Sequence, residues 1–183
     1  MRILKPSLQG RGLLNLYQPT AGDGCVLWYP GQDDPYSATI RDRSGQGNNG
    51  SITGATWAKL SRGLWSLYFD GVNDVVTTAS NLNLSIANGL SIVVWFNVAS
   101  VAAGTRQIVD CRAAVDSGEF ALLCVSNDLY FYLMRDIAAT YCGYMVVDCL
   151  SANTWYCCGI TWVGGNISVA PLMYLNGVSQ VVA

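Results

Sequence analysis

The sequence predicts an all-β fold, a sandwich built from short antiparallel strands. Trp65, Leu67 and Phe69 alternate with Ser66 and Tyr68, which is the period-2 pattern of a half-buried strand. Short runs of this kind recur along the chain, and turn residues separate them at close intervals. No stretch has a sustained helical period, and the sequence contains no internal repeat.

Turn residues set the limits of the strands predicted in the first half of the chain. Pro30-Gly31 ends the first strand, a turn-rich segment over 41–50 precedes the second, and Asp70-Gly71 follows the third. The third strand, its turn and the strand that follows are expected to form a central hairpin. In this half, strands are expected over 25–29, 52–57, 64–69 and 75–76.

In the second half, the run over 90–98 is apolar on both faces near its centre, which is typical of a sheet covered on both sides. Hairpins are expected around Ser126-Asn127-Asp128 and across Asn176-Gly177. Tyr130 and Tyr132 share one face of a strand, and this pair fits either a core or an interface. The remaining strands are expected over 107–111, 120–125, 129–134, 141–147, 155–162, 172–175 and 178–182.

A series of motifs occurs in a fixed order along the chain. Residues 69–76 match the pattern F-D-G-x-x-D-x-V, and residues 42–50 match D-x-S-G-x-G-N-x-G. The others are V-L-W-Y-P at 26–30, T-G-A-T-W at 53–57, L-S-I-V-V-W-F at 90–96, N-T-W-Y at 153–156 and Y-L-N-G-V at 174–178. Together they resemble laminin-G-like domains, which have the concanavalin A-like jelly-roll fold, over roughly Gly24 to Val178.

This resemblance implies a concanavalin A-like (laminin-G-like) jelly-roll β-sandwich over residues 24–183, preceded by an extended N-terminal arm, residues 1–23. Family members continue past the L-N-G-V hairpin with a closing strand and an acidic strand, whereas this sequence ends at Ala183. Either the sequence is truncated, or the sandwich lacks its last strands. In the second case it would expose a sheet edge that a neighbouring subunit covers by strand addition.

Charge is scarce in this sequence and unevenly placed. Charged residues make up 12% of the chain, well below the usual share of about 25%. Residues 1–20 hold Arg2, Lys5 and Arg11 and no acidic residue, whereas residues 21–183 hold the other seven basic residues and all twelve acidic ones. The basic arm either pairs with the acidic body of a neighbour or is a solvated tail. An acidic body is not expected to bind nucleic acid.

The seven cysteines are interpreted as reduced, buried side chains that act as small hydrophobes. There is no C-x-x-C and no histidine, so the usual zinc spacings are missing. A disulfide such as Cys142 to Cys149 is the alternative. The first residues lack the apolar core of a secretory signal. No stretch approaches the ~20 apolar residues of a membrane span.

Catalytic residue pairs are not found, and we predict that the protein is not an enzyme. Glucanases of the related fold carry their carboxylates in an E-x-D-x-x-E pattern on one strand, whereas this chain has a single glutamate, Glu119. Without histidine, Ser-His-Asp and Cys-His mechanisms are also excluded.

Asp70, Asn73 and Asp74 are the candidate metal ligands. Laminin-G-like domains often bind calcium near a sheet edge, so the resemblance implies a calcium site formed by these oxygen ligands. The alternative is an Asx turn in which Asp70 bonds to the backbone amides of its own turn, and we favour this interpretation. No other cofactor is expected.

Aromatic and apolar side chains are the candidate contact residues. Tyr29 and Tyr36 flank a polar loop and suit contact with a sugar or a protein. Trp65 and Trp95 are expected in or near the core. The arm supplies an apolar cluster formed by Leu13, Leu14, Leu16 and Tyr17.

The predicted function is that of a non-enzymatic structural or adhesion module, a subunit of a larger assembly such as a phage virion (capsid, decoration or tail protein). Its partners would be other subunits or further copies of itself. We expect synthesis in the cytoplasm without a signal peptide and a final location in the virion. The alternative is a free carbohydrate-binding lectin with a glycan partner and an extracellular location.

Overall fold

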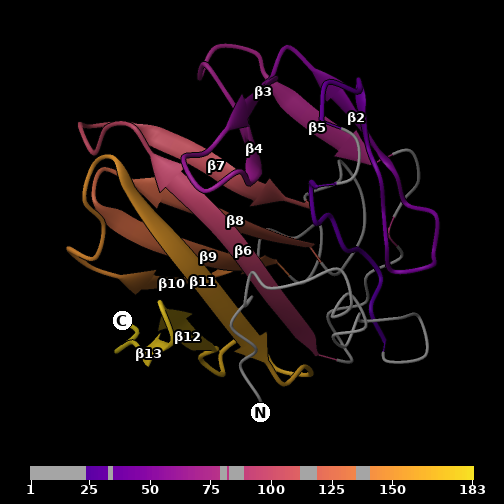
Figure 1. Cartoon of the computed structure of the whole chain (residues 1–183). Helices are drawn as coiled ribbons and strands as arrows, with labels where there is room; N and C mark the ends of the chain where they lie inside the picture. The colour runs from indigo at the N-terminus through magenta and orange to yellow at the C-terminus, as the bar shows by residue number, and fades with distance from the viewer. Residues whose placement is uncertain (1–23, 33–34, 79–81, 83–88, 112–118, 135–140) are drawn as a thin grey trace. The chain divides into compact units, whose positions relative to one another are not determined.

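The computed structural model describes residues 24–32, 35–78, 82, 89–111, 119–134 and 141–183. Every regular secondary-structure element within these residues is a β-strand (Figure 1). The all-β prediction is therefore confirmed. The chain divides into two compact units, Met1–Leu82 and Asn83–Ala183. This boundary lies inside the span 24–183 that the sequence assigns to one sandwich.

The first unit contains two small antiparallel sheets. A three-stranded sheet has the order β1-β2-β5, and a separate two-stranded sheet pairs β3 with β4. The strands are β1 (Thr39–Ile40), β2 (Gly50–Thr53), β3 (Thr56–Lys59), β4 (Trp65–Tyr68) and β5 (Val75–Thr78).

The expected central hairpin is wrong, although both of its strands exist. β4 pairs with β3, and β5 pairs with β2, so the strands on either side of Asp70-Gly71 belong to different sheets. Gly54, which has φ +77, lies at the turn between β2 and β3. The strand expected over 52–57 is therefore two strands, and each of them recruits its own partner.

The strand expected over 25–29 is also absent, because backbone groups of this segment form hydrogen bonds with the loop over 42–48. The amide of Trp28 donates to Asp42 Oδ1 at 2.9 Å, and the carbonyl of Trp28 accepts from the amide of Arg43 at 2.9 Å. The carbonyl of Val26 accepts from the side-chain amide of Asn48 at 2.8 Å. Loop contacts therefore satisfy these backbone groups in place of a strand ladder.

The second unit is a sandwich of two four-stranded antiparallel sheets (Figure 1). One sheet has the order β13-β12-β11-β6 and the other β10-β9-β8-β7. The strands are β6 (Leu90–Val98), β7 (Thr105–Asp110), β8 (Glu119–Val125), β9 (Asp128–Met134), β10 (Tyr141–Val146), β11 (Thr154–Trp162), β12 (Leu172–Leu175) and β13 (Val178–Ser179).

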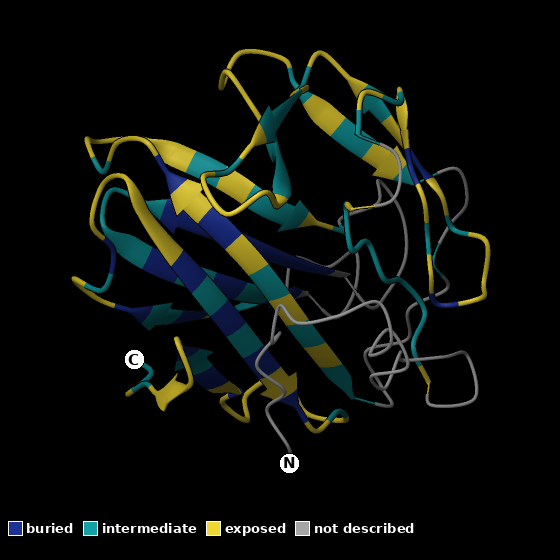
Figure 2. Cartoon of the chain, viewed as in Figure 1, coloured by how far each residue is buried: buried dark blue, intermediate teal, exposed yellow. Residues whose placement is uncertain are grey.

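The core of this unit is formed by the inner faces of the two sheets. Along β11 buried residues alternate with more exposed ones, as the banding of its ribbon in Figure 2 shows, whereas Phe120 to Cys124 of β8 are all buried. Leu129, Phe131 and Leu133 of β9 belong to this core and have no exposed surface. The inner residues from β6, β9, β11 and β12 are Phe96, Val98, Leu129, Phe131, Leu133, Tyr156, Cys158, Ile160, Trp162, Met173 and Leu175.

Turn residues fix both predicted hairpins of this unit. Ser126 has φ +54 in the β8–β9 connection, where Val125 lies opposite Asp128. Asn176 and Gly177 have φ +51 and +83, as a type I′ turn requires, and they join β12 to β13. Both hairpins are therefore confirmed.

Candidate functional site

The outer face of the β13-β12-β11-β6 sheet is the candidate site, and we call its residues the uncharged face. The side chains of β6 alternate, so that Phe96 packs inward and Trp95 is 67% exposed. The register places Trp95 beside Cys157 and Val93 beside Gly159. The uncharged face consists of Ser91, Val93, Trp95 and Asn97 of β6, Trp155, Cys157, Gly159 and Thr161 of β11, and Leu172 and Tyr174 of β12.

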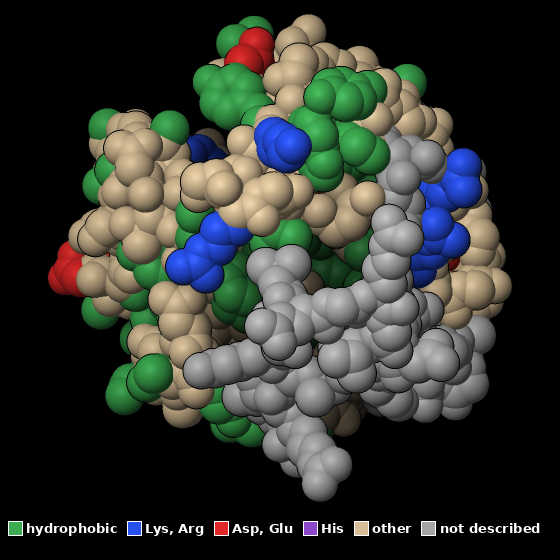
Figure 3. Space-filling model, viewed as in Figure 1, with side chains coloured by type: hydrophobic (Ala, Val, Ile, Leu, Met, Phe, Trp, Pro, Cys, Tyr) green, Lys and Arg blue, Asp and Glu red, His purple; other side chains and the backbone are tan. Residues whose placement is uncertain are grey.

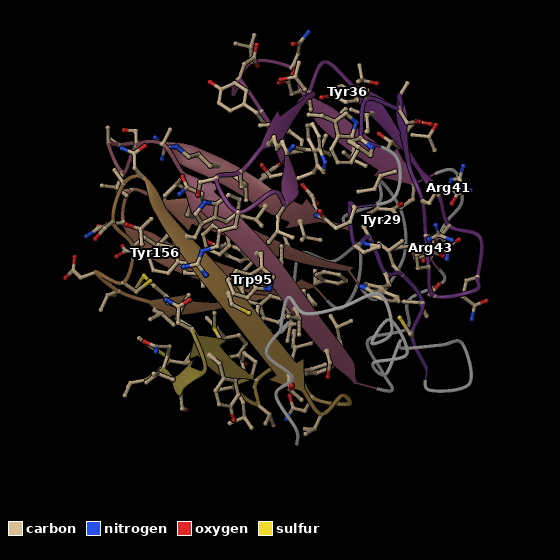
Figure 4. The ribbon with its side chains drawn as sticks, in the orientation of Figure 1. Tyr29, Tyr36, Arg41, Arg43, Trp95 and Tyr156 are labelled. Atoms are coloured by element: carbon tan, nitrogen blue, oxygen red, sulfur yellow. The ribbon has the colours of Figure 1, made fainter. Side chains whose placement is uncertain are left out.

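Large apolar side chains on this face are open to solvent. Val93 is 73% exposed and Leu172 56% exposed. The expectation that Trp95 lies in the core is therefore wrong. Figure 4 labels Trp95 on β6 and the inward-facing Tyr156 on β11. The sequence contained a sign that Trp95 faces outward. Ser91 and Asn97 lie on the same face of the strand as Trp95, and polar residues at both ends of that face indicate an outer face.

The strands that build this face contain no charged residue. The sequences of β6, β11, β12 and β13 have no Asp, Glu, Lys or Arg, whereas β7, β8 and β9 each contain at least one. On the side of the molecule seen in Figure 3, charged side chains form isolated patches. An exposed apolar surface without charges is typical of a contact surface.

The outer face of the other sheet is occupied by its own aromatic pair. The rings of Tyr130 and Tyr132 stack with centroids 5.9 Å apart and an interplanar angle of 7°. Tyr132 lies opposite Gly143, and a Cβ at that glycine would come within 2.8 Å of the ring. The ring thus covers the bare backbone of the neighbouring strand, and the pair serves packing within the sheet.

In the first unit, Tyr36 lies on the surface, as expected for a contact residue. It is 78% exposed and has φ +79, which is rare for a residue with a side chain. Its ring meets Trp65 edge-on, with centroids 4.9 Å apart, and Lys59 Nζ lies 5.7 Å from the centre of the Trp65 ring. Gln32 fixes this region, because its side chain exchanges two hydrogen bonds with the backbone of Trp65, at 2.9 Å each.

Tyr29 has a structural contact of its own in the first unit. Its hydroxyl donates to the carbonyl of Asn48 at 2.6 Å, inside the loop that follows β1. Burial, together with the nearby Asp42 carboxylate, raises the pKa of Tyr29 to about 12. Figure 4 shows Tyr29 and Tyr36 at separate places in this unit. A role for Tyr29 in partner contact stays a prediction.

Asp42 organises that loop. Its carboxylate accepts from the amides of Trp28, Ser44 and Asn48, each at 2.9 Å, and from the Ser44 hydroxyl at 2.7 Å. Burial acts to raise the pKa of Asp42, but these hydrogen bonds outweigh it and hold the pKa below its usual value. Ser44, which is part of this loop, is itself buried.

The candidate calcium ligands form the Asx turn that we favoured. Asp70 Oδ1 accepts from the amide of Val72 at 2.8 Å, and Asp74 Oδ2 accepts from the amide of Asp70 at 2.7 Å. Asn73 is exposed in the same turn. Among the described residues, no group of three or more His, Cys, Asp or Glu is placed to hold a metal ion. Calcium binding stays a prediction.

The arm residues Leu13, Leu14, Leu16 and Tyr17 lie outside the described residues. In the part of the chain that the structure describes, no helix has the length and apolar character needed to cross a membrane. All seven cysteines, including Cys142 and Cys149, are free thiols in the structure.

Comparison with known proteins gives no assignment. No family model matches the sequence, and no curated protein matches it significantly. The class of protein that the structure defines is an all-β protein with antiparallel sheets, one pair of which forms a sandwich. The resemblance to laminin-G-like domains stays a prediction.

Proposed function

We propose that the chain is a non-enzymatic structural or adhesion module, a subunit of a larger assembly such as a phage virion, as a capsid, decoration or tail protein. The observation that carries this proposal is the uncharged face. Monomeric soluble proteins rarely expose contiguous apolar patches larger than a few hundred Å², and larger patches mark contact sites for proteins or ligands. Val93, Trp95 and Leu172 supply the apolar area for such a contact.

The energetic argument favours burial over charge pairing in this assembly. Burying an aliphatic or aromatic side chain stabilises a contact by roughly 1.5–3 kcal/mol, whereas an exposed ion pair contributes about 0–1 kcal/mol. The uncharged face offers no ion pairs, and the basic arm offers an apolar cluster in addition to its charges. Assembly should therefore persist in moderate salt.

Deleting residues 1–20 tests the proposal, because this arm is the segment expected to join subunits. The full chain should have a mass above that of a monomer in size-exclusion chromatography with light scattering. The deletion variant should have a smaller mass than the full chain and keep the β-type circular dichroism spectrum. A full chain that is a stable monomer, or a deletion variant that assembles as well as the full chain, would contradict the proposal.

A second candidate function, carbohydrate binding by a free lectin-like module, is favoured by Tyr36. Its backbone has a strained conformation with φ +79, and its exposed ring packs edge-on against Trp65. An exposed aromatic ring in a fixed position suits stacking on a sugar. This function predicts a monomer that binds glycans. Tyr36→Ala should then abolish binding on a glycan array, while Val72→Ala, another exposed position of the same unit, should not.

A further inference from the structure

The sandwich of the second unit has four sheet edges, and three of them carry protective features. β13 is only two residues long. β10 is paired beyond its sheet, since Met145 and Ala183 exchange two backbone hydrogen bonds of 3.0 Å. β7 contains a bulge between Gln107 and Val109 and the charged residues Arg106 and Asp110. Short strands, bulges and charges are the features by which proteins block pairing at an edge.

The fourth edge, β6, has none of these features. The strand is nine residues long, contains no charge, proline or glycine, and pairs with β11 in regular register at all nine positions. In an antiparallel ladder, alternate residues direct their N–H and C=O groups away from the partner strand. Within the described residues, no strand pairs with β6 on that far side. The edge is therefore a template for strand addition.

We propose that β6 pairs with β6 of a second copy of this chain, antiparallel across a two-fold axis. This inference rests on the proposed function and names one contact of the assembly. Overlap of all nine residues gives the longest ladder and places Val94 on the axis. Val93 then lies opposite Trp95 of the second copy, Ile92 opposite Phe96, and Ser91 opposite Asn97.

This register keeps the outer and the inner face of the joined sheet continuous across the two copies. Odd-numbered residues meet odd-numbered ones, so outer side chains pair with outer ones and inner side chains with inner ones. On the outer side, the two symmetry-related Val93–Trp95 pairs combine an aromatic with a β-branched residue, which is a favourable cross-strand pair. On the inner side, Ile92 and Phe96 extend the apolar cores toward each other.

A second copy fits this edge because the strand is complementary to itself. With no charge in β6, no like charges face each other in the antiparallel pair, and the polar residues Ser91 and Asn97 meet at both ends. A two-fold contact of this kind is closed and does not propagate into a fibre. The result is one continuous eight-stranded sheet with the uncharged face on its outer side.

Charges introduced at Val93 and Trp95, the two outer positions nearest the axis, test the pairing and its register. One full-chain variant carries Val93→Lys and Trp95→Lys, and the other carries Val93→Glu and Trp95→Glu. In either variant alone, each introduced charge faces a like charge of the second copy, so dimer affinity should fall at least about tenfold. An equimolar mixture should recover a one-to-one heterodimer, since every facing pair then has opposite charges.

Val147→Lys is the control, because Val147 is 54% exposed and follows β10 in the other sheet, away from both β6 and the uncharged face. It should leave dimer affinity unchanged. Masses are measured by sedimentation velocity, and folding is checked by circular dichroism. The proposal is overturned if either charged variant associates like the unmodified chain, if the mixture forms no heterodimer, or if Val147→Lys weakens association as much.

The mass of the unmodified chain separates this inference from the proposed function. If the unmodified chain associates and the charged variants associate equally well, the β6 contact is wrong and the assembly function stands. If the unmodified chain is a monomer, the assembly function fails as well. If deletion of residues 1–20 removes the same species and the mixture recovers nothing, association depends on the arm and the β6 pairing is wrong.

Discussion

At the scale of single residues, Asp42 shows how one carboxylate replaces a strand ladder. Its two oxygens accept four hydrogen bonds and join the segment at Trp28 to the turn at Ser44 and Asn48. The D-x-S-G-x-G-N pattern therefore has a structural explanation within the loop itself. The sequence identified the pattern, but it did not show that the neighbouring segment gives up its strand to this loop.

Asp42→Asn is expected to destabilise the first unit by roughly 1–2 kcal/mol. An amide keeps one acceptor, but its NH₂ group must face a backbone N–H of Ser44 or Asn48. Because the folded-state pKa of Asp42 is lowered, its stabilisation is complete above the unfolded pKa of about 4 and is lost as pH falls through the folded value.

Urea unfolding at neutral pH and near pH 3 measures this effect. The difference in unfolding free energy between the unmodified chain and Asp42→Asn should shrink at the lower pH. Asp70→Asn is the control, since Asp70 accepts a single backbone amide and an amide oxygen can replace that contact. A difference that is independent of pH would show that the carboxylate charge is not what holds the loop.

At the scale of elements, glycine conformation decides how the strands of the first unit are shared between sheets. Gly54 has φ +77, and a Cβ there would overlap the carboxylate of Asp74. Gly54 lies between β2 and β3 in the run over 52–57, and β2 pairs with β5 whereas β3 pairs with β4. Alternation alone predicts the strands but not their partners, because partner choice depends on the backbone angle between them.

Gly54→Ala is expected to destabilise the first unit by more than the roughly 1–2 kcal/mol that a left-handed alanine costs, because the added carbon also displaces Asp74. Gly63→Ala is the matched control: Gly63 has φ +83 and open space where a Cβ would lie. Denaturant unfolding of both variants measures the difference. Equal losses for the two would show that the contact with Asp74 carries no weight.

At the scale of the whole molecule, the cysteines report on the redox state of the chain. They occur in both units, and none is paired in the structure. Burial, with Cys157 and Cys149 nearby, raises the pKa of Cys158 to about 12, and burial with the nearby Asp110 carboxylate raises the pKa of Cys111 to about 11. Their thiolate forms are therefore scarce at neutral pH, which makes these thiols unreactive in the folded protein.

Thiol counting in denaturant without reductant should find most of the seven cysteines of the sequence. In the folded protein, Cys158 should resist alkylation, while the only partly buried Cys25 serves as the comparison. Mass spectrometry of alkylated peptides resolves the individual sites. One or no free thiol in the denatured chain would instead indicate a disulfide framework and an exported protein.

The sequence by itself determined the all-β class, the limits of β6 and the hairpin at Asn176-Gly177, because period-2 alternation and turn residues act locally. It also placed Tyr130 and Tyr132 on one face of their strand, but the structure decided that the opposite face, with Leu129, Phe131 and Leu133, is the buried one. Only the tertiary structure decided that β4 and β5 have different partners and that Trp95 faces solvent. Those outcomes depend on which strands meet and which sheet face remains uncovered, and contacts between residues far apart in the sequence settle both.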